Sequence, residues 1–312
     1  MTGSTSRYMY AVALGAIALG IGGAMQYGSI ILVSSAPSGA APILPIDPEY
    51  VQLAAIPLEV LHDVREVSSQ PDPVLSMANA ISAPENKCEI TMTANPAAAA
   101  MVSVDVKAPC HANTAVTIHH NGLMFTETTD DNGALSLDVP ALSENALFMA
   151  DFGGADVAVA ATDVSSFIFY DRAVVQWQGQ SGLELHAREF SEDYSGPGHV
   201  WRDAARNTSI AAQGKGGMLI ELGNSNLPQA RLAEVYTFPS LTSDNSGDVL
   251  LSVEAEVTTG NCAQDVNAQI LQTNGSGRVR VQDVLISVPE CDAVGELLVL
   301  QNVLDDLKIA AR

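Results

Sequence analysis

The feature that most constrains this chain is an uncharged apolar stretch near its N-terminus, from Ala11 to Val33. Its 23 residues, at about 1.5 Å of helical rise each, suffice to cross a hydrocarbon layer of about 30 Å. A cleavable signal peptide usually has a shorter apolar core of about 7 to 15 residues. In addition, Pro37 directly follows the best small-residue cleavage site, Ser34 and Ala36. We therefore predict an uncleaved membrane-spanning helix.

Charges around this stretch predict its orientation. Arg7 is the only charged side chain before Asp47, and the next Lys or Arg is Arg65. Because short cytoplasmic segments carry the excess of basic residues, residues 1–33 are predicted to be a cytoplasmic stub and a single-pass anchor. The bulk of the chain then lies on the oxidising side, which is the periplasm for a bacterial inner-membrane protein.

Small residues recur along one side of the predicted helix. Ala16, Gly20, Ala24 and Gly28 are four residues apart and share one face, and Gln26 lies near one end of it. Such a face lets another helix approach closely, and glutamine can hydrogen-bond across the contact. The stripe predicts packing against a partner helix or a second copy of this chain. The alternative is chance spacing in an Ala- and Gly-rich helix.

The charge balance is strongly acidic. The 312 residues include 14 Lys plus Arg against 36 Asp plus Glu, which gives a formal net charge of −22. Such a surface repels nucleic acid and anionic lipid headgroups, so neither is expected as a partner. The apolar content of 47% is typical of a folded chain rather than of a disordered acidic tail.

Four cysteines lie beyond the apolar stretch in two separated pairs. They allow three connectivities, and the one that closes short loops within separate folding units is favoured. Their spacing is too wide for a CxxC redox motif or a zinc ribbon. We predict disulfides Cys88–Cys110 and Cys262–Cys291, with free buried thiols as the alternative, and we expect no metal or cofactor.

The chain after the anchor is rich in proline. Eight of the fifteen prolines lie between Pro37 and Pro84, which predicts an extended linker over residues 34–85. Within it, residues 57–67 have apolar side chains at helical spacing behind a proline suited to a first helical turn. This segment is predicted to be a short helix that docks on the folded part or on a partner.

After Asn86 the sequence changes to short alternating or apolar runs separated by turn signals, as in an all-β sandwich. Asn121 with Gly122 is the strongest hairpin signal and Asn132 with Gly133 is a second, so two adjacent hairpins are expected. Residues 86–163 are assigned to a β-sandwich domain, with strands expected at 90–93, 101–106, 115–120, 123–128, 134–139 and 157–161.

One turn and strand in this region resemble a known family. Residues 129–141, TDDNGALSLDVPA, resemble the turn-and-strand signature of carboxypeptidase-regulatory-like sandwich domains. The resemblance implies a β-sandwich accessory module without catalytic residues. Cys88 and Cys110 are not part of that family's pattern, so the resemblance applies to the middle of the domain rather than to its start.

Residues 164–312 are assigned to a second, mainly β domain, with strands expected at 167–177, 183–189, 218–222, 231–238, 249–257 and 279–288. The apolar residues from Leu297 to Leu307 fit a strand that leads into a short helix, and periodicity does not decide between strand and helix there. The stretch from Ser191 to Lys215 is irregular and is the one long loop suited to a surface site. The expected fold class is therefore mainly β, with a transmembrane helix, a Pro-rich linker and two β-sandwich-like domains.

That loop carries the candidate binding residues Tyr194, His199, Trp201 and Arg202. Aromatic and charged side chains on such a loop can grip a peptide or a sugar, and the alternative is a loop pinned by one buried tryptophan. On the predicted strand before it, polar residues alternate with apolar ones. They are interpreted as a solvated face: Glu184, His186 and Arg188.

Other polar residues fit structural roles better than metal sites. His119 and His120 are adjacent on a predicted strand, so they point to opposite faces and cannot readily share a metal, even with His111 nearby. Asp130 and Asp131 fit a hairpin turn, because the twelve-residue calcium-loop pattern is missing.

The common catalytic signatures are missing from the sequence: GxxxxGK[ST], GxGxxG after a strand, HExxH and GxSxG. The whole chain, from the run at 20–26 through residues 199–201 to residues 298–302, is similar to uncharacterised alphaproteobacterial envelope proteins often labelled "translocase". Because no residues resemble a nucleotide-driven motor or a multi-span channel, this resemblance implies at most an accessory role at a membrane machine.

Anchor, linker and β modules together predict a membrane-anchored periplasmic adaptor that binds other envelope proteins and catalyses no reaction. One alternative is an auxiliary subunit of an inner-membrane complex, such as one for protein translocation, recruited through the small-residue stripe. The other is an anchored hydrolase or carbohydrate-acting enzyme. It would need two carboxylates within about 10 Å in one cleft, drawn from Glu184, Glu189, Asp193 and Asp203.

Overall fold

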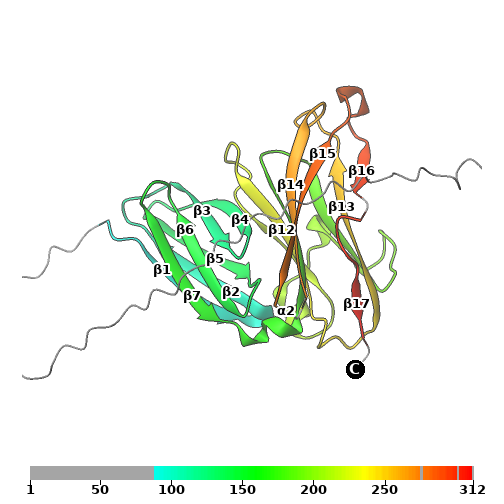
Figure 1. Cartoon of the computed structure of the whole chain (residues 1–312), viewed down its shortest axis with the longest axis horizontal. Coiled ribbons are helices and arrows are strands. Elements are labelled where there is room, and N and C mark those ends of the chain that lie inside the picture. The colour runs from blue at the N-terminus through cyan, green and yellow to red at the C-terminus, as the bar shows by residue number, and fades with distance from the viewer. Residues whose placement is uncertain (1–87, 275–276, 301, 311–312) are drawn as a thin grey trace, which may run out of the picture. The chain divides into compact units, whose positions relative to one another are not determined.

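The computed structural model describes residues 88–312 apart from 275–276, 301 and 311–312, and this part of the chain is mainly β (Figure 1). The predicted anchor with its stripe of small residues, the linker and the helix at 57–67 lie outside the described residues. Among the residues that are described, no helix is long and apolar enough to span a membrane.

The strands before residue 164 form a sandwich of two antiparallel sheets, ordered β1-β2-β5 and β4-β3-β6-β7. A short 3-10 helix, η1 (Ala98–Ala100), joins β1 to β2. The strands are β1 (Thr91–Ala97), β2 (Met101–Lys107), β3 (Ala115–His120), β4 (Leu123–Thr128), β5 (Ala134–Pro140), β6 (Asn145–Asp151) and β7 (Val157–Asp163).

The β3–β4 hairpin confirms the strongest turn signal. Asn121 and Gly122 have φ of 49° and 95°, the left-handed values that a two-residue hairpin turn of this type requires, and His120 pairs directly with Leu123. Asparagine and glycine tolerate these angles at low cost. The turn therefore sets the register, which puts Ile118 and Phe125 in the core.

The second expected hairpin is wrong. A tight turn does form at Asn132 and Gly133, because the Asp130 carboxylate accepts backbone N–H groups from Asn132 and Ala134. However, the strands on either side belong to different sheets: β5 pairs with β2, whereas β4 pairs with β3. Turn chemistry determines that the chain reverses and does not determine which strand becomes its partner.

The later strands form a second sandwich of two sheets. We call β11-β12-β8-β14-β15 the middle sheet and β10-β9-β13-β16, with β17 also paired to β13, the outer sheet. The strands are β8 (Asp171–Gln178), β9 (Leu183–Glu189), β10 (His199–Val200), β11 (Met218–Leu222), β12 (Arg231–Phe238), β13 (Gly247–Glu256), β14 (Asp265–Thr273), β15 (Val279–Ser287), β16 (Leu297–Leu300) and β17 (Leu307–Ile309).

Short helical turns occupy the connections of the second sandwich. They are the 3-10 helices η2 (Ser165–Phe169), η3 (Arg202–Ala204) and η4 (Cys291–Ala293), and the α-helix α2 (Thr208–Ala212). The stretch from Ser191 to Lys215 is therefore not one irregular loop, because it contains β10, η3 and α2. The strand expected at 167–177 begins later, at Asp171, because residues 165–169 form the 3-10 helix η2 instead.

Several strand expectations need correction. β6 and β14 were not expected, although Val266, Ala268 and Ile270 on β14 alternate inward as a half-buried strand requires. At the C-terminal end, β16 and β17 are both strands paired with β13, so the alternative of a short helix there is wrong. Pairing with a neighbouring strand overrides helical spacing in so short an apolar run.

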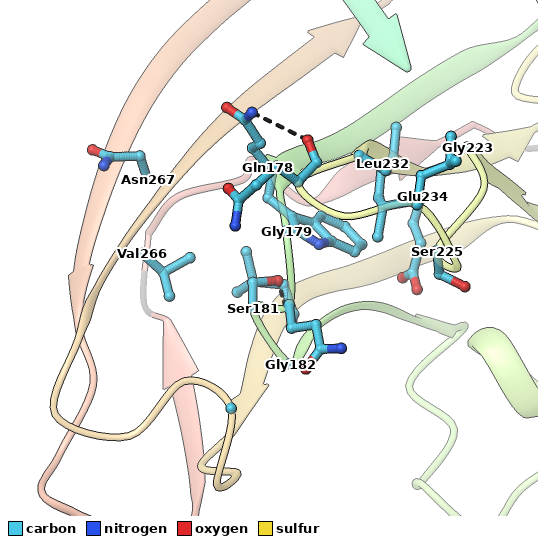
Figure 2. Close-up of a pocket in the computed structure, with 18 of the residues that line it drawn as sticks. Gln178, Gly179, Ser181, Gly182, Gly223, Ser225, Leu232, Glu234, Val266 and Asn267 are labelled. Carbon is cyan, nitrogen blue, oxygen red and sulfur yellow. Dashed lines mark hydrogen bonds between the residues drawn. The ribbon is translucent and has the colours of Figure 1, made fainter. Parts of the chain in front are cut away.

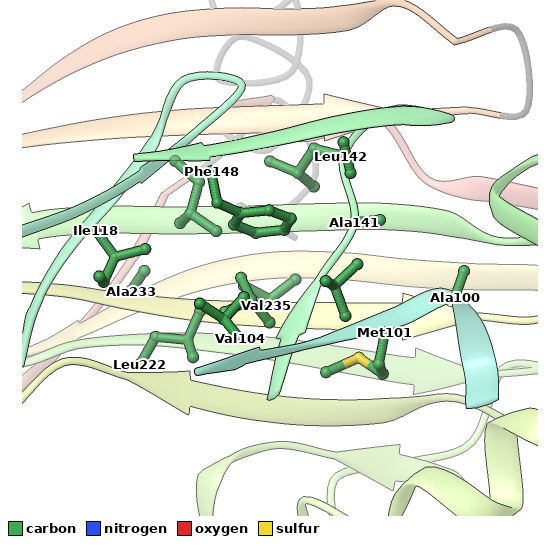
Figure 3. Packing of buried hydrophobic residues seen from close by; sticks show 14 of the residues in the cluster. Ala100, Met101, Val104, Ile118, Ala141, Leu142, Phe148, Leu222, Ala233 and Val235 are labelled. Carbon is green, nitrogen blue, oxygen red and sulfur yellow. The ribbon is translucent and has the colours of Figure 1, made fainter. Parts of the chain in front are cut away.

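The first sandwich packs on the middle sheet through a shared apolar core. Leu222, Ala233 and Val235 of the middle sheet belong to the same buried cluster as Val104 and Phe148 of the first sandwich (Figure 3). The other face of the middle sheet packs on the outer sheet in a second buried cluster. Because its two faces pack on different layers, the central strands β8 and β12 of the middle sheet are buried along nearly their whole length.

Two buried polar side chains of β8 tie the first sandwich to the middle sheet. The Gln176 amide donates to the Gly122 carbonyl and accepts from the Met124 backbone N–H. The guanidinium of Arg172 donates to the carbonyls of Ala99 and Ala100, and burial lowers its pKa to about 9. These hydrogen bonds add directional contacts to an otherwise apolar interface.

Both predicted disulfides are present. Cys88 and Cys110 have Cα atoms 5.1 Å apart, and Cys262 and Cys291 have Cα atoms 5.0 Å apart, both within the usual range for a bridge. The first bridge closes a loop at the start of the first sandwich. The second joins the β13–β14 connection to η4 in the second sandwich.

Removing the second bridge should weaken the fold measurably. Replacing Cys262 and Cys291 together by serine frees a loop with a sequence separation of 29, so we expect the free energy of unfolding to fall by about 3 kcal/mol. Urea unfolding followed by tryptophan fluorescence measures this change. Wild-type protein treated with reductant is the control, and a midpoint unchanged in both samples would contradict the expectation.

Candidate functional site

Polar side chains gather on the outward face of β9. Glu184, His186 and Arg188 share that face, while Leu183 and Leu185 point into the core of the second sandwich. The expectation of a solvated face is wrong, because His186 is only 6% exposed. The segment 190–201 folds back over the strand, and its β10 pairs with β9.

Three aromatic rings stack over this face, and we call His186, His199 and Trp201 the His–Trp stack. Ring centroids lie 5.1 Å apart for His186 and His199, and 5.4 and 5.6 Å for their contacts with Trp201, all nearly parallel. The Nε2 of His199 and the Nδ1 of His186 lie 2.9 Å apart and form a hydrogen bond, whose direction depends on which of the two nitrogens carries the proton. The covering segment is thus fixed by rings rather than by one buried tryptophan.

Tyr194 completes this cover. Its hydroxyl donates to Glu254 of β13 at 2.6 Å, and the Arg188 guanidinium lies 4.8 Å from the centre of its ring. Its carbonyl oxygen lies 2.8 Å from the Nδ1 of His199. Burial, followed by the hydrogen bond to Glu254, raises the pKa of the Tyr194 hydroxyl.

Arg202 connects the His–Trp stack to the middle sheet. Its guanidinium donates to Glu184 at 3.1 Å, to Glu234 of β12 at 2.6 Å and to the carbonyl of Leu183 at 3.0 Å. Glu234 in turn accepts the backbone N–H of Leu185 at 2.6 Å. Burial raises the pKa of Glu234, while Leu185 and Arg202 act in the opposite direction. These hydrogen bonds satisfy the backbone N–H of Leu185 and the backbone carbonyl of Leu183, at the end of β9 that β10 does not pair with.

The structure therefore brings together Tyr194, His199, Trp201 and Arg202, the four residues proposed from the loop sequence. Sequence reasoning missed His186, Glu254 and Glu234, which complete the cluster from three different strands. No local pattern marks Glu254 or Glu234. His186 could have been noticed because it lies on the strand that precedes the loop. However, the alternation of polar and apolar residues on that strand led to the interpretation that His186 faces solvent.

Arg202 and Glu234 also line a cleft at one end of the second sandwich, and we call it the loop cleft (Figure 2). Its volume is about 840 Å³, and its walls come from three loops, within residues 178–182, 223–230 and 260–267. The Gln178 side chain donates to the carbonyl of Gln229 at 3.1 Å, which links two of the three loops. The size suits a small molecule or a short chain segment.

The lining of the loop cleft is mostly polar and uncharged. Amide side chains contribute donors and acceptors from each of the three loops: Gln178, Gln180, Gln229, Gln264 and Asn267. Trp177, which is 8% exposed, supplies apolar surface between them. Glu221 and Asp265 are the carboxylates that line the cleft beside Glu234.

The four carboxylates proposed for a hydrolase do not share this cleft. Glu184 and Glu189 lie on opposite faces of β9, because they are separated by an odd number of positions. Asp193 and Asp203 are exposed outside the lining. The cleft instead holds Glu221 and Glu234, directly paired on β11 and β12, and both oxygens of Glu234 already accept hydrogen bonds.

The histidines of the first sandwich lie apart from this region. His119 and His120 point to opposite faces of β3 as predicted, and His120 is buried. His111 lies 3.3 Å from Asp156. Across the described residues, no group of three or more His, Cys, Asp and Glu side chains could hold a metal ion.

Comparisons with known proteins add little to this geometry. No family model matches the sequence, and no curated protein matches it. Among solved structures, the chain is similar to a calcium-stabilised, ice-binding adhesin of an Antarctic bacterium, with 13% identity, 64% of this chain and 74% of that chain covered, and a TM-score of 0.19. A likeness at this level carries no functional argument.

Proposed function

We propose that this chain is a periplasmic adaptor, held in the bacterial inner membrane by one N-terminal helix, that binds other envelope proteins and catalyses no reaction. The anchor at residues 1–33 and the linker at 34–85 rest on the sequence. The observation that carries the proposal is the loop cleft, about 840 Å³ in volume and built from three loops at one end of a sandwich. Loops in this position commonly form recognition surfaces.

The lining supports an extended polypeptide segment as the ligand. Amides such as Gln178, Gln229 and Asn267 both donate and accept, and a peptide backbone offers N–H and C=O groups in the same alternation. Trp177 offers apolar surface to one side chain of the segment.

Charge supports a neutral or basic segment over an acidic one. Arg202 is the sole Lys or Arg among the residues that line the cleft, and Glu184 and Glu234 already hold its guanidinium. Glu221 and Asp265 add negative charge to the lining, on a chain whose net charge is −22. An acidic ligand would therefore meet repulsion both at long range and on contact.

The same arrangement supports binding over hydrolysis. Glu234 is the most buried carboxylate of the cleft, but Arg202 and the backbone N–H of Leu185 occupy its two oxygens. A general acid needs a proton to give and a free path to the substrate. Held in this way, Glu234 fixes the wall of the cleft instead.

Blocking the cleft tests the proposal. Ser225→Trp adds an indole to an exposed lining position, and Ser246→Trp adds one to the exposed residue just before β13, which does not line the cleft. The amount of partner protein that co-purifies with the full-length chain from mildly solubilised membranes should fall about tenfold with the first variant. It should be retained with the second.

Membrane abundance of both variants is the control for folding. Equal recovery of partner proteins with Ser225→Trp and with wild type, at equal abundance, would contradict binding in the loop cleft.

A further inference from the structure

The two histidines of the His–Trp stack make three hydrogen-bond contacts, and each contact requires one proton on a ring nitrogen. His199 Nδ1 faces the carbonyl oxygen of Tyr194 at 2.8 Å, so this nitrogen carries a proton, because a carbonyl only accepts. His186 Nδ1 and His199 Nε2 lie 2.9 Å apart and share one proton. His186 Nε2 lies 3.3 Å from an oxygen of Glu184.

The third contact also needs a proton. The hydrogen bond with His186 lowers the pKa of Glu184, whose other oxygen accepts from Arg202, so Glu184 is a carboxylate that only accepts. His186 Nε2 must therefore donate. An oxygen of Glu254 lies 4.0 Å from the same nitrogen and adds a second negative charge.

Counting protons then fixes the charge of the pair. Two neutral imidazoles carry two N–H groups in total, whereas the three contacts need three. His186 and His199 together therefore hold one extra proton and one positive charge. If that proton leaves, one contact places an acceptor against an acceptor. If a further proton arrives, both nitrogens at the 2.9 Å contact carry hydrogens that point at each other.

The charged groups around the pair favour the singly charged state. Glu184 from β9 and Glu254 from β13 attract its positive charge, while Arg188 and Arg202 on the same side oppose a second one. Burial lowers the pKa of His199, with the backbone carbonyl of Tyr194 acting in the opposite direction. Burial is the larger effect and disfavours a positive charge on His199, so the single charge belongs to the pair as a unit.

We propose that His186 and His199 hold the segment 190–201 against β9 in only one protonation state and thereby fix Arg202 on the wall of the loop cleft. We call this histidine pair the clasp. Glu184 is the link, because one of its oxygens faces His186 and the other accepts from Arg202. The inference rests on the proposed function, since it assigns a regulation to that same cleft. We therefore expect partner binding to be strongest at intermediate pH and weaker at both lower and higher pH.

Hydrogen exchange of the full-length protein, measured by mass spectrometry at about pH 5, 7 and 9, tests the clasp without any ligand. Peptides covering residues 190–204 should be most protected at the middle pH and about tenfold less protected at each end. Peptides from β8 (Asp171–Gln178) are the internal reference, because they report global unfolding and the intrinsic pH dependence of exchange.

Two matched variants separate the loss of protection at low pH, which we call the acid limb, from the loss at high pH, which we call the alkaline limb. His199→Gln keeps a donor and an acceptor but cannot take up the further proton, so the acid limb should disappear and the alkaline limb should remain. His119→Gln, on the opposite face of β3 from the core, should keep both limbs. A flat wild-type profile, or an acid limb unchanged in His199→Gln, would overturn the clasp.

The clasp and the proposed function fail separately. Exchange at 190–204 needs no partner, so a pH-dependent profile supports the clasp even if cleft-blocking substitutions leave co-purification unchanged. A flat profile overturns the clasp even if those substitutions abolish co-purification.

Discussion

Replacing Glu189 by alanine is expected to lower the free energy of unfolding by about 3 to 5 kcal/mol. Glu189 is buried on the core face of β9, where it accepts from the Tyr236 hydroxyl at 2.8 Å and from the Gly217 N–H at 2.7 Å. Both oxygens also accept from Arg206, at 3.0 and 2.9 Å. Alanine removes the acceptor of the Tyr236 hydroxyl and of the Gly217 N–H, and it leaves the Arg206 guanidinium with only the carbonyls of Gly217 and Pro197 as acceptors.

Urea unfolding measures this effect against Asp193→Ala, which removes an exposed carboxylate and should change stability by less than about 0.5 kcal/mol. The double variant Glu189→Ala, Arg206→Ala should regain part of the loss, because it removes the uncompensated cation. Equal effects of Glu189→Ala and Asp193→Ala would show that the buried network contributes nothing to stability.

Acid should destabilise the first sandwich through His120. Burial lowers its pKa to about 4; the hydrogen bond to the Leu147 carbonyl acts in the opposite direction and Arg172 lowers it further. The neutral ring donates from Nδ1 to Leu147 and accepts the Leu142 N–H at Nε2. An imidazolium can no longer accept that N–H, so protonation breaks a contact in the core.

The folded pKa lies below the unfolded value of 6.5, so the unfolded chain binds the proton first. The contribution of His120 is therefore complete above about pH 6.5 and is lost as pH falls toward 4, by about 3 kcal/mol in all. His120→Gln should be less stable than wild type at neutral pH but should lose less on acidification. Urea midpoints at about pH 7.5 and 4 measure this difference, and identical acid losses in both proteins would contradict it.

The fold was predictable where local chemistry decides it. Strands β3, β4, β9, β11 and β12 occur at the expected bounds, because apolar alternation ended at clear turn signals. The disulfide pairing was predictable from short loop closure. Sheet membership was not, since the turn at Asn132 looks the same whether the next strand pairs with its neighbour or crosses to another sheet.

The site divides in the same way. Tyr194, His199, Trp201 and Arg202 are close in sequence, so their gathering could be expected from one loop. Glu254 lies sixty positions from the Tyr194 hydroxyl that it accepts from, and only the order of the sheets brings them together. The loop cleft was not predictable at all, because its three walls meet through the non-sequential order β12-β8-β14.

Binding of a partner segment in the loop cleft is the central claim, and site-specific photo-crosslinking in intact cells tests it most directly. A photoreactive phenylalanine at Gln229, an exposed residue of the lining, should form a discrete adduct whose mass-spectrometric crosslink maps to a neutral or basic segment of another envelope protein. The same residue at Leu147, 59% exposed on the first sandwich, is the control and should not form that adduct. Ser225→Trp should abolish the adduct at Gln229. An identical adduct from both positions, or none from Gln229 at normal membrane abundance, would contradict the claim.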